Sequence, residues 1–151
     1  MTVELIKQML DACYQAKRAR ELLPTLPEGV LPSYIQYLDV IQKLEAQGLS
    51  ARVSDISDAL HLPRPGVTRT VKEMERKGYL KKIASAEDGR VTYLTPTEAG
   101  QKLSHIFDEQ YFQALAPFME AISEEDAECM IRTIEQFYNI MSERRISLDN
   151  K

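Results

Sequence analysis

The helix predicted after Pro63 carries two chemically different faces. Its apolar side chains recur three or four positions apart, which at about 100° per residue places them on one side. The apolar face holds Val67, Val71 and Met74, and the opposite face holds Pro65, Arg69, Lys72 and Arg76. Guanidinium and ammonium groups bind phosphate oxygens, and an arginine can also donate two hydrogen bonds to a guanine. The chemistry predicted for this face is therefore non-covalent binding of a nucleic acid.

A second arm with a basic side chain follows that helix. Two apolar runs, 79–84 and 91–94, are rich in strand-forming residues. Asp88 and Gly89 lie between them and give a turn signal, so the segment predicts a β-hairpin. Arg90 comes directly after the turn.

Positive charge is concentrated in this part of the chain. The chain has 151 residues and a net charge of −4. From position 63 to position 95 there are eight basic and four acidic residues, so this span carries +4 and the remainder carries −8. A basic segment on an acidic body is typical of a module that faces phosphates. Solvated lysines and arginines are also common on helices, so charge alone leaves both interpretations open.

Composition excludes several other classes of protein. Hydrophobic residues make up 44% and charged residues 28%, which is typical of one globular domain, or of a small domain with helical arms. We expect a cytoplasmic protein with no membrane span, because the chain contains no run of about 20 apolar residues and no secretory signal. Cys13 and Cys129 lie far apart and share no ligand spacing with His61 or His105, so neither a disulfide, a metal site nor a cofactor is predicted.

The remaining pattern is helical. Apolar periodicity predicts helices over 3–23, 33–47 and 54–61, a helix from Pro96 to Phe118, and a last helix after Ser123. Ser54 is predicted to cap the third of these helices. Thr95 is predicted to cap the next helix after the hairpin, with Pro96 in its first position and Glu98 completing a capping box.

Helix, turn, helix and β-ribbon is the order of a winged helix-turn-helix, which places one helix in the DNA major groove. We therefore predict a mainly α fold with a small β-wing. Residues 33–95 would form the winged helix-turn-helix DNA-binding domain. Residues 1–32 and 96–146 would form a helical dimerisation region, because these helices are too apolar to stand as loose arms. They could also pack within one chain, but a symmetric homodimer suits paired DNA half-sites.

Residues 53–103 resemble the MarR family of transcriptional regulators. The resemblance rests on VTRTVKEMERKGYLKK around the predicted outward-facing helix, on Asp88-Gly89-Arg90 at the hairpin tip, and on the run from Leu94 to Gly100. It implies a homodimeric regulator that binds double-stranded DNA. The fourth helix would enter the major groove, and Arg90 would reach the minor groove. It also implies, in many members, release of DNA when a small aromatic effector binds.

The chemistry of individual residues predicts their roles in this interface. Arg69 is the predicted base reader, while lysines and Arg76 suit phosphate contacts. Asp88 either holds Arg90 by an ion pair or serves the turn alone, and Lys81 and Lys82 either contact phosphates or lie on a solvated strand edge. The predicted DNA-binding set is Ser54, Ser57, Arg64, Pro65, Gly66, Thr68, Arg69, Lys72, Arg76, Lys81, Lys82, Asp88 and Arg90.

Candidates for sensing are fewer. By the same resemblance, a cysteine on the first helix can respond to oxidants, and aromatic side chains can line an effector site. The candidates are Cys13, Tyr14, Tyr34 and Tyr37. A reactive thiol needs a lowered pKa and exposure, so Cys13 is interpreted first as a packing residue and second as a sensor.

Two other functions compete with DNA binding. A winged helix can instead bind a protein, and acidic side chains on the outward face would have favoured that alternative. Glu73 and Glu75 lie on the same helix but off the centre of this face. An enzyme would need a converging acid, base or nucleophile, and the sequence offers no such set, so we do not predict catalysis.

Overall fold

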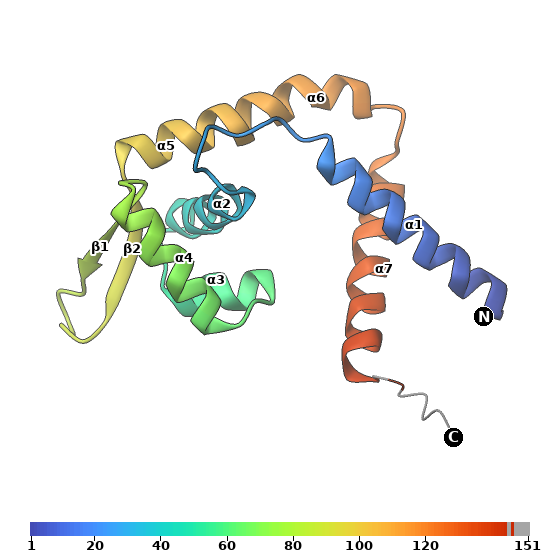
Figure 1. Ribbon diagram of the computed structural model, residues 1–151, viewed down its shortest axis with the longest axis horizontal. Helices are drawn as coiled ribbons and strands as arrows, with labels where there is room; N and C mark the ends of the chain where they lie inside the picture. Colours follow the sequence, from blue (N-terminus) through green and yellow to red (C-terminus); the bar gives the residue numbers. More distant parts are fainter. Residues whose placement is uncertain (145, 147–151) are drawn as a thin grey trace. The chain divides into compact units, whose positions relative to one another are not determined.

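The fold is described from a computed structural model, which covers residues 1–144 and 146 (Figure 1). Its contacts divide the chain into two compact units, Met1–Tyr111 and Phe112–Lys151. The elements are α1 (Val3–Glu21), α2 (Pro32–Ala46), α3 (Val53–Leu60), α4 (Arg64–Arg76), β1 (Leu80–Ala84), β2 (Thr92–Pro96), α5 (Glu98–Ser104), the π-helix η1 (His105–Gln110), α6 (Tyr111–Met119) and α7 (Glu124–Glu143). The predicted mainly α fold with a small β-wing is confirmed.

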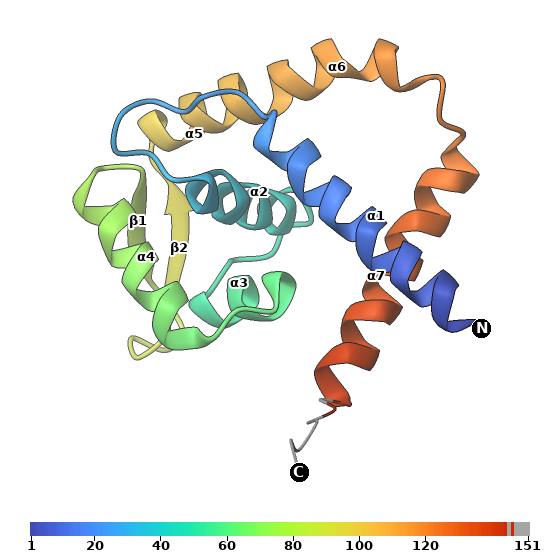
Figure 2. The same ribbon diagram turned by 45° about the vertical axis from the view of Figure 1, so that its right-hand side comes forward.

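The winged part of the first unit is built on α2. Figures 1 and 2 show α3 and α4 side by side on one flank of α2, with the two strands next to α4. Pro32 stands in the first turn of α2, where its missing N–H costs no helical hydrogen bond. Gly48 ends this helix region with a φ of +75°, a conformation that glycine adopts without a Cβ clash.

The turn between α3 and α4 is short and tightly bonded. His61 closes α3 in the left-handed region, with a φ of +52°. The Ser57 hydroxyl, at the other side of the turn, donates to the Leu62 carbonyl at 2.5 Å. These contacts fix the path of the chain into α4, which begins at Arg64 with Pro65 in its first turn.

The wing is a two-stranded antiparallel hairpin. Leu80 pairs with Pro96 at its base and Ala84 with Thr92 near its tip. Ala51 adds an isolated bridge to Leu94, and the Leu94 N–H donates to the Ala51 carbonyl at 2.8 Å. The hairpin is therefore tied to the segment that leads into α3 as well as to α4.

One apolar core lies inside the winged part. It draws on α2, α3, α4, both strands and α5, which is why these elements hold one another in place. The core contains Val30, Tyr34, Tyr37, Leu38, Ile41, Ala51, Ile56, Val67, Val71, Met74, Leu80, Leu94 and Leu103.

The start of α5 corrects one sequence prediction. Thr95 and Pro96 belong to β2, because they pair with Lys81 and Leu80 in the hairpin. The helix is instead capped by Thr97, whose hydroxyl accepts from the Gly100 N–H at 3.1 Å. The predicted cap therefore lay two residues too early.

Gly100 explains how α5 can approach the wing so closely. A Cβ at this position would lie 2.1 Å from the Tyr79 carbonyl oxygen, which is closer than any side-chain carbon can come. Only glycine fits here, because the obstacle is backbone and cannot move aside.

The helix predicted from Pro96 to Phe118 is interrupted. Residues His105–Gln110 form a π-helical segment, and α6 follows with Pro117 inside it. Ser104 is fully buried and donates to the Gln42 side chain at 2.7 Å, which attaches the end of α5 to α2.

The outer helices carry no buried residues. This holds for α1 in the first unit and for α7 in the second. Ser123 caps α7 by accepting from the Asp126 N–H at 3.0 Å, as its position in the sequence predicted. Among the described residues, no helix is both long enough and apolar enough to cross a membrane.

Candidate nucleic-acid interface

The two faces predicted for α4 are present. Val67, Val71 and Met74 are 0%, 1% and 0% exposed, so the inner face is fully buried. Arg69 and Lys72 are exposed on the other side, as are Arg64, Pro65, Gly66 and Arg76, while Thr68 is half-buried. The core thus holds the helix by one side and leaves a basic side open to a partner.

The two acidic residues of α4 are paired within the chain. Lys77 Nζ lies 2.9 Å from Glu73 Oε1, and Lys82 Nζ lies 2.8 Å from Glu75 Oε2. Both carboxylates are therefore neutralised by lysines that belong to the same unit. For Lys82 the sequence left open a phosphate contact or a solvated strand edge, and the structure shows it in an ion pair with Glu75.

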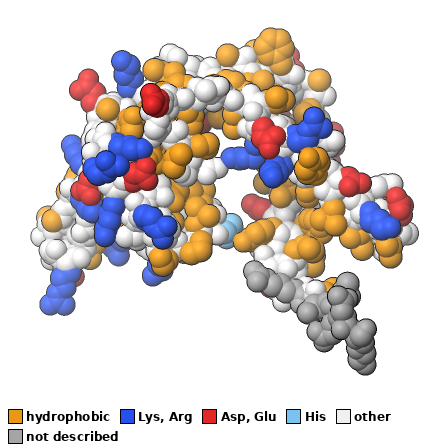
Figure 3. Space-filling view, viewed as in Figure 1, with side chains coloured by type: hydrophobic (Ala, Val, Ile, Leu, Met, Phe, Trp, Pro, Cys, Tyr) orange, Lys and Arg blue, Asp and Glu red, His pale blue; other side chains and the backbone are white. Residues whose placement is uncertain are grey.

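Six cations remain on this part of the surface. They are exposed, and within residues 1–144 and 146 they form no ion pair: Arg64, Arg69, Lys72, Arg76, Lys81 and Arg90. Figure 3 shows Lys and Arg side chains gathered over the region that Figure 1 draws as α4 and the strands. Because lysines internally balance the acids of α4, the exposed charge is positive.

The wing tip shows which role Asp88 takes. Its carboxylate accepts from the Arg90 N–H at 3.0 Å, and its carbonyl accepts from the Val91 N–H at 2.9 Å. Ser85 Oγ accepts from the N–H groups of Glu87 and Asp88. Asp88 therefore shapes the turn, and the described side chains form no Asp88–Arg90 ion pair. Within the part of the chain that the structure describes, the Arg90 guanidinium at the end of the hairpin forms no ion pair.

The start of α3 differs from the prediction. Arg52, not Ser54, is the N-cap, and Ser54 is the second residue of the helix. The Asp55 carboxylate accepts a hydrogen bond from the Arg52 N–H at 2.7 Å, which gives the backbone donor just before the helix a partner. Ser57 is only 7% exposed and its hydroxyl is bonded to Leu62, so it cannot reach a phosphate in this conformation. Ser54 is half-buried.

Tyr34 and Tyr37 lie in the core rather than on a surface. They are 0% and 2% exposed. The Tyr34 hydroxyl donates to Glu73 Oε1 at 2.5 Å and accepts from Lys77 Nζ at 3.0 Å. Lys77 Nζ also donates to the Gly29 carbonyl at 2.5 Å. The cluster joins α2, α4 and the connection from α1.

The same contacts shift three pKa values. Burial, and then the hydrogen bond to Glu73, raise the pKa of Tyr34 above its ordinary value. The Tyr34 hydroxyl and the Lys77 ammonium stabilise the carboxylate and lower the pKa of Glu73. Tyr34 and Glu73 in turn raise the pKa of Lys77. The cluster is therefore held in its neutral-Tyr, charged-Glu, charged-Lys state.

Two of the sensing candidates lie on α1. Cys13 is half-buried and Tyr14 is 62% exposed. Cys129, on α7, is exposed. Among the described residues, no three His, Cys, Asp or Glu side chains are grouped as metal ligands.

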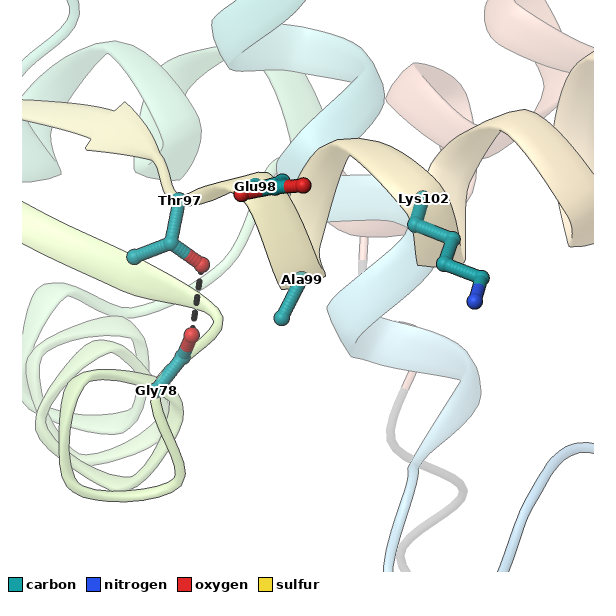
Figure 4. Close-up of a pocket in the computed structure, with 5 residues that line it drawn as sticks. All are labelled: Gly78, Thr97, Glu98, Ala99 and Lys102. Carbon is teal, nitrogen blue, oxygen red and sulfur yellow. Dashed lines mark hydrogen bonds between the residues drawn. The ribbon is translucent and has the colours of Figure 1, made fainter.

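The sequence did not indicate two further contacts near the wing. The Arg52 guanidinium carbon lies 5.4 Å from the Tyr93 ring centre, which places another cation beside β2. The Thr97 hydroxyl donates to the Gly78 carbonyl at 2.5 Å beside an open hollow that Ala99 and Lys102 also line (Figure 4). Arginine stacks on aromatic rings, but Arg52 and Tyr93 are 41 positions apart in the sequence. No local pattern could therefore have revealed their contact.

Residues 28–91, which hold the core of the winged unit and most of its hairpin, match the family model described as MarR family. The match spans 64 of the 151 residues, and over this segment the chain resembles the MarR family. The resemblance found in the sequence is thereby confirmed. No curated protein matches the chain by sequence.

Solved MarR-type structures share the fold along nearly the whole chain. A complex of Streptococcus pneumoniae FabT with DNA is 21% identical, with 94% of this chain and 99% of that one covered and a TM-score of 0.66. A MarR/EmrR family transcriptional regulator from Acinetobacter sp. ADP1 is 20% identical, covers 95% and 100%, and also scores 0.66. An S. aureus MepR–DNA complex is 19% identical, covers 93% and 99%, and scores 0.59.

Proposed function

We propose that this protein is a transcriptional regulator that binds double-stranded DNA in a sequence-specific manner. The observation that carries the proposal is the exposed basic face of α4, whose acidic residues are paired internally. An α-helix fits the major groove, and lysines and arginines bind the phosphates that border it. The FabT and MepR structures named above are DNA complexes of proteins with this fold.

Within this proposal each cation has a role set by its chemistry. Arg69 lies near the middle of the exposed face and reads a base, because its guanidinium can bond two acceptors of one guanine. Lys72, Arg76 and Lys81 contact phosphates. Arg90 sits at the hairpin tip, where it suits the narrow minor groove beside the helix.

The regulator acts as a homodimer in this proposal. On α7, Met130, Ile131 and Ile134 are 57%, 55% and 40% exposed, and on α1 Val3 and Tyr14 are 71% and 62% exposed. Helices with exposed apolar stripes mark surfaces that pack against a partner. A second copy is the partner of choice, because two winged units would then meet two DNA half-sites. Such a regulator works in the cytoplasm, and a small aromatic molecule is its proposed effector.

Selection from random DNA duplexes tests the proposal. The purified protein should enrich an inverted repeat whose half-site centres lie about 10 base pairs apart, or a multiple of that spacing. The Arg69→Ala/Lys72→Ala variant should enrich nothing, while Lys17→Ala/Arg18→Ala, which loses the same charge on α1, should enrich the same repeat. No enrichment by the unchanged protein at low salt would reject DNA binding and favour a winged helix that binds a protein.

The homodimer has its own measurement. Sedimentation equilibrium should give twice the mass of one chain, and Ile134→Glu should shift the mass toward one chain because a charge cannot be buried unpaired in an apolar contact. The exposed Glu120→Gln change is the control and should leave the mass unchanged. A single-chain mass at micromolar concentration would remove the dimer from the proposal.

A further inference from the structure

The contacts of Tyr34, Glu73, Lys77 and the Gly29 carbonyl form what we name the α4 clamp. Lys77 Nζ is its centre, with Glu73 at 2.9 Å, Tyr34 at 3.0 Å and Gly29 at 2.5 Å. Gly29 has a φ of +76° and belongs to the connection between α1 and α2. The clamp therefore joins three separate stretches of the chain at the end of α4.

We infer that the α4 clamp sets the rotation of the DNA-reading helix and thereby its base specificity, an inference that rests on the proposed function. The clamp side chains bond one another and the Gly29 carbonyl, and none of them is more than partly exposed. Tyr34 is fully buried, and the Glu73 and Lys77 side chains are 35% and 26% exposed. Their role is to position other residues.

The clamp adds directional restraints to those of the apolar core. Val67, Val71 and Met74 anchor one face of α4 by close packing, and the clamp bonds the helix near its C-terminal end. Hydrogen bonds are directional and weaken when they are misaligned. Those of the clamp arise from Glu73 on α4 and from Lys77, the C-cap residue of that helix, which lie four positions apart.

A small rotation would matter at the exposed face. Side chains reach about 5–6 Å from a helix axis, so a turn of about 20° moves their ends by about 2 Å. A bidentate contact to a base tolerates only about 0.5 Å in distance. Glu73 follows Arg69 by a single turn, so the clamp acts close to the predicted base reader. Contacts to phosphates by flexible lysines tolerate such a shift better.

Two variants each remove part of the clamp with little change in volume. Tyr34→Phe deletes the hydroxyl and keeps the buried ring, and Lys77→Met deletes the ammonium group. Lys43→Met is the matched control, because it removes an exposed lysine from the 2.7 Å ion pair with Asp39 on α2. Each protein is assayed for affinity toward the selected duplex and toward a scrambled duplex of equal length, after circular dichroism shows that it folds.

The clamp predicts a loss of specificity rather than a general loss of affinity. In Tyr34→Phe and Lys77→Met, the ratio of specific to scrambled affinity should fall about tenfold, which is the effect of one mismatched base pair. Scrambled affinity should stay within about twofold, and Lys43→Met should change neither quantity. Where one clamp variant fails to fold, the other variant or Glu73→Gln decides.

The outcomes separate the clamp from the proposed function. An unchanged ratio in a folded clamp variant, with specific binding by the unchanged protein, would overturn the clamp alone. Equal losses on both duplexes would also overturn it, because they would show a merely structural role. No binding by the unchanged protein would overturn DNA recognition itself, and with it the clamp.

Discussion

Lys82 Nζ lies 2.8 Å from Glu75 Oε2, so the first wing strand is tied to the outward-facing helix by an ion pair. The neighbouring Lys81 is exposed and forms no such pair within the described residues. The two adjacent lysines therefore differ. Lys82 is held in an ion pair with an acid of α4, and Lys81 is the one that we propose for a phosphate contact.

Glu75→Gln should strengthen binding to non-specific DNA. The change releases Lys82, which can then contact a phosphate and release one more counterion. The slope of log affinity against log salt should become steeper by about one per subunit. Fluorescence anisotropy across a salt series measures it. In the Glu75→Gln/Lys82→Met protein the extra slope should vanish, and persistence of the slope would show that Lys82 is not the group involved.

Arg69→Ala and Lys72→Ala should weaken DNA binding in different ways. Removing Arg69 should cost about 1–3 kcal/mol at one position of the duplex and relax base preference there, while Lys72→Ala should weaken all sequences alike. Competition with single-base variants of the selected duplex gives both patterns. A uniform loss in Arg69→Ala would assign that arginine to the phosphates instead.

Gly100→Ala should destabilise the winged unit. Its Cβ would meet the Tyr79 carbonyl oxygen, and α5 would have to move away from the wing. We expect a loss of about 1–3 kcal/mol in the free energy of unfolding, measured by urea denaturation. Unchanged stability would mean that α5 does not approach the wing as closely as the structure shows.

Gly66→Ala is a matched control with a second purpose. A Cβ there meets nothing within 4 Å, and Gly66 lies inside α4, so stability should hold or rise by up to about 1 kcal/mol. DNA affinity should nevertheless fall, because the added methyl group stands on the proposed DNA-facing surface. Full affinity in Gly66→Ala would place the first turn of α4 away from the duplex.

Acid should weaken the fold through Glu73. Its pKa lies below the ordinary 4.5 because Tyr34 and Lys77 donate to the carboxylate, whereas the unfolded chain keeps the ordinary value. Between the two values the unfolded chain binds more protons, so this stabilisation is complete above 4.5 and is lost as the pH falls through the folded-state pKa. Lys77 acts at the other end, because its pKa is raised above 10.5 and its contribution is lost as the pH rises through the raised value.

Urea denaturation between about pH 2 and pH 7 measures the acid effect. Glu73→Gln should flatten the dependence of unfolding free energy on pH below about 4.5. The control is Glu87→Gln, whose side chain forms no hydrogen bond or ion pair within the described residues, and it should keep the dependence of the unchanged protein. Equal curves for Glu73→Gln and the unchanged protein would contradict the assigned cause of the pKa shift.

The sequence predicted what local patterns determine. The apolar period of α4 placed Val67 inside and Arg69 outside because helical geometry relates positions a few residues apart. The turn signal at Asp88 and Gly89 correctly predicted the hairpin, because it too depends on neighbouring residues. The fold class and the resemblance to the family followed from the order of such elements.

Contacts between distant segments and competition at helix ends were not predictable in this way. Tyr34 and Glu73 are 39 positions apart, so only the packed fold shows their hydrogen bond. Ser54 has the chemistry of a cap, yet Asp55 bonds the Arg52 N–H and moves the start of α3 earlier. Thr95 and Pro96 also suit a helix start, but both residues pair with the first strand of the hairpin and belong to β2.

The central claim is that the exposed cations of α4 and the wing bind DNA. It is tested most directly by the salt dependence of affinity for the selected duplex, compared between the unchanged protein and Lys72→Ala/Lys81→Ala. The account predicts a steep negative slope for the unchanged protein, and one shallower by about two per subunit for the variant. A slope near zero, or identical slopes for the two proteins, would contradict it.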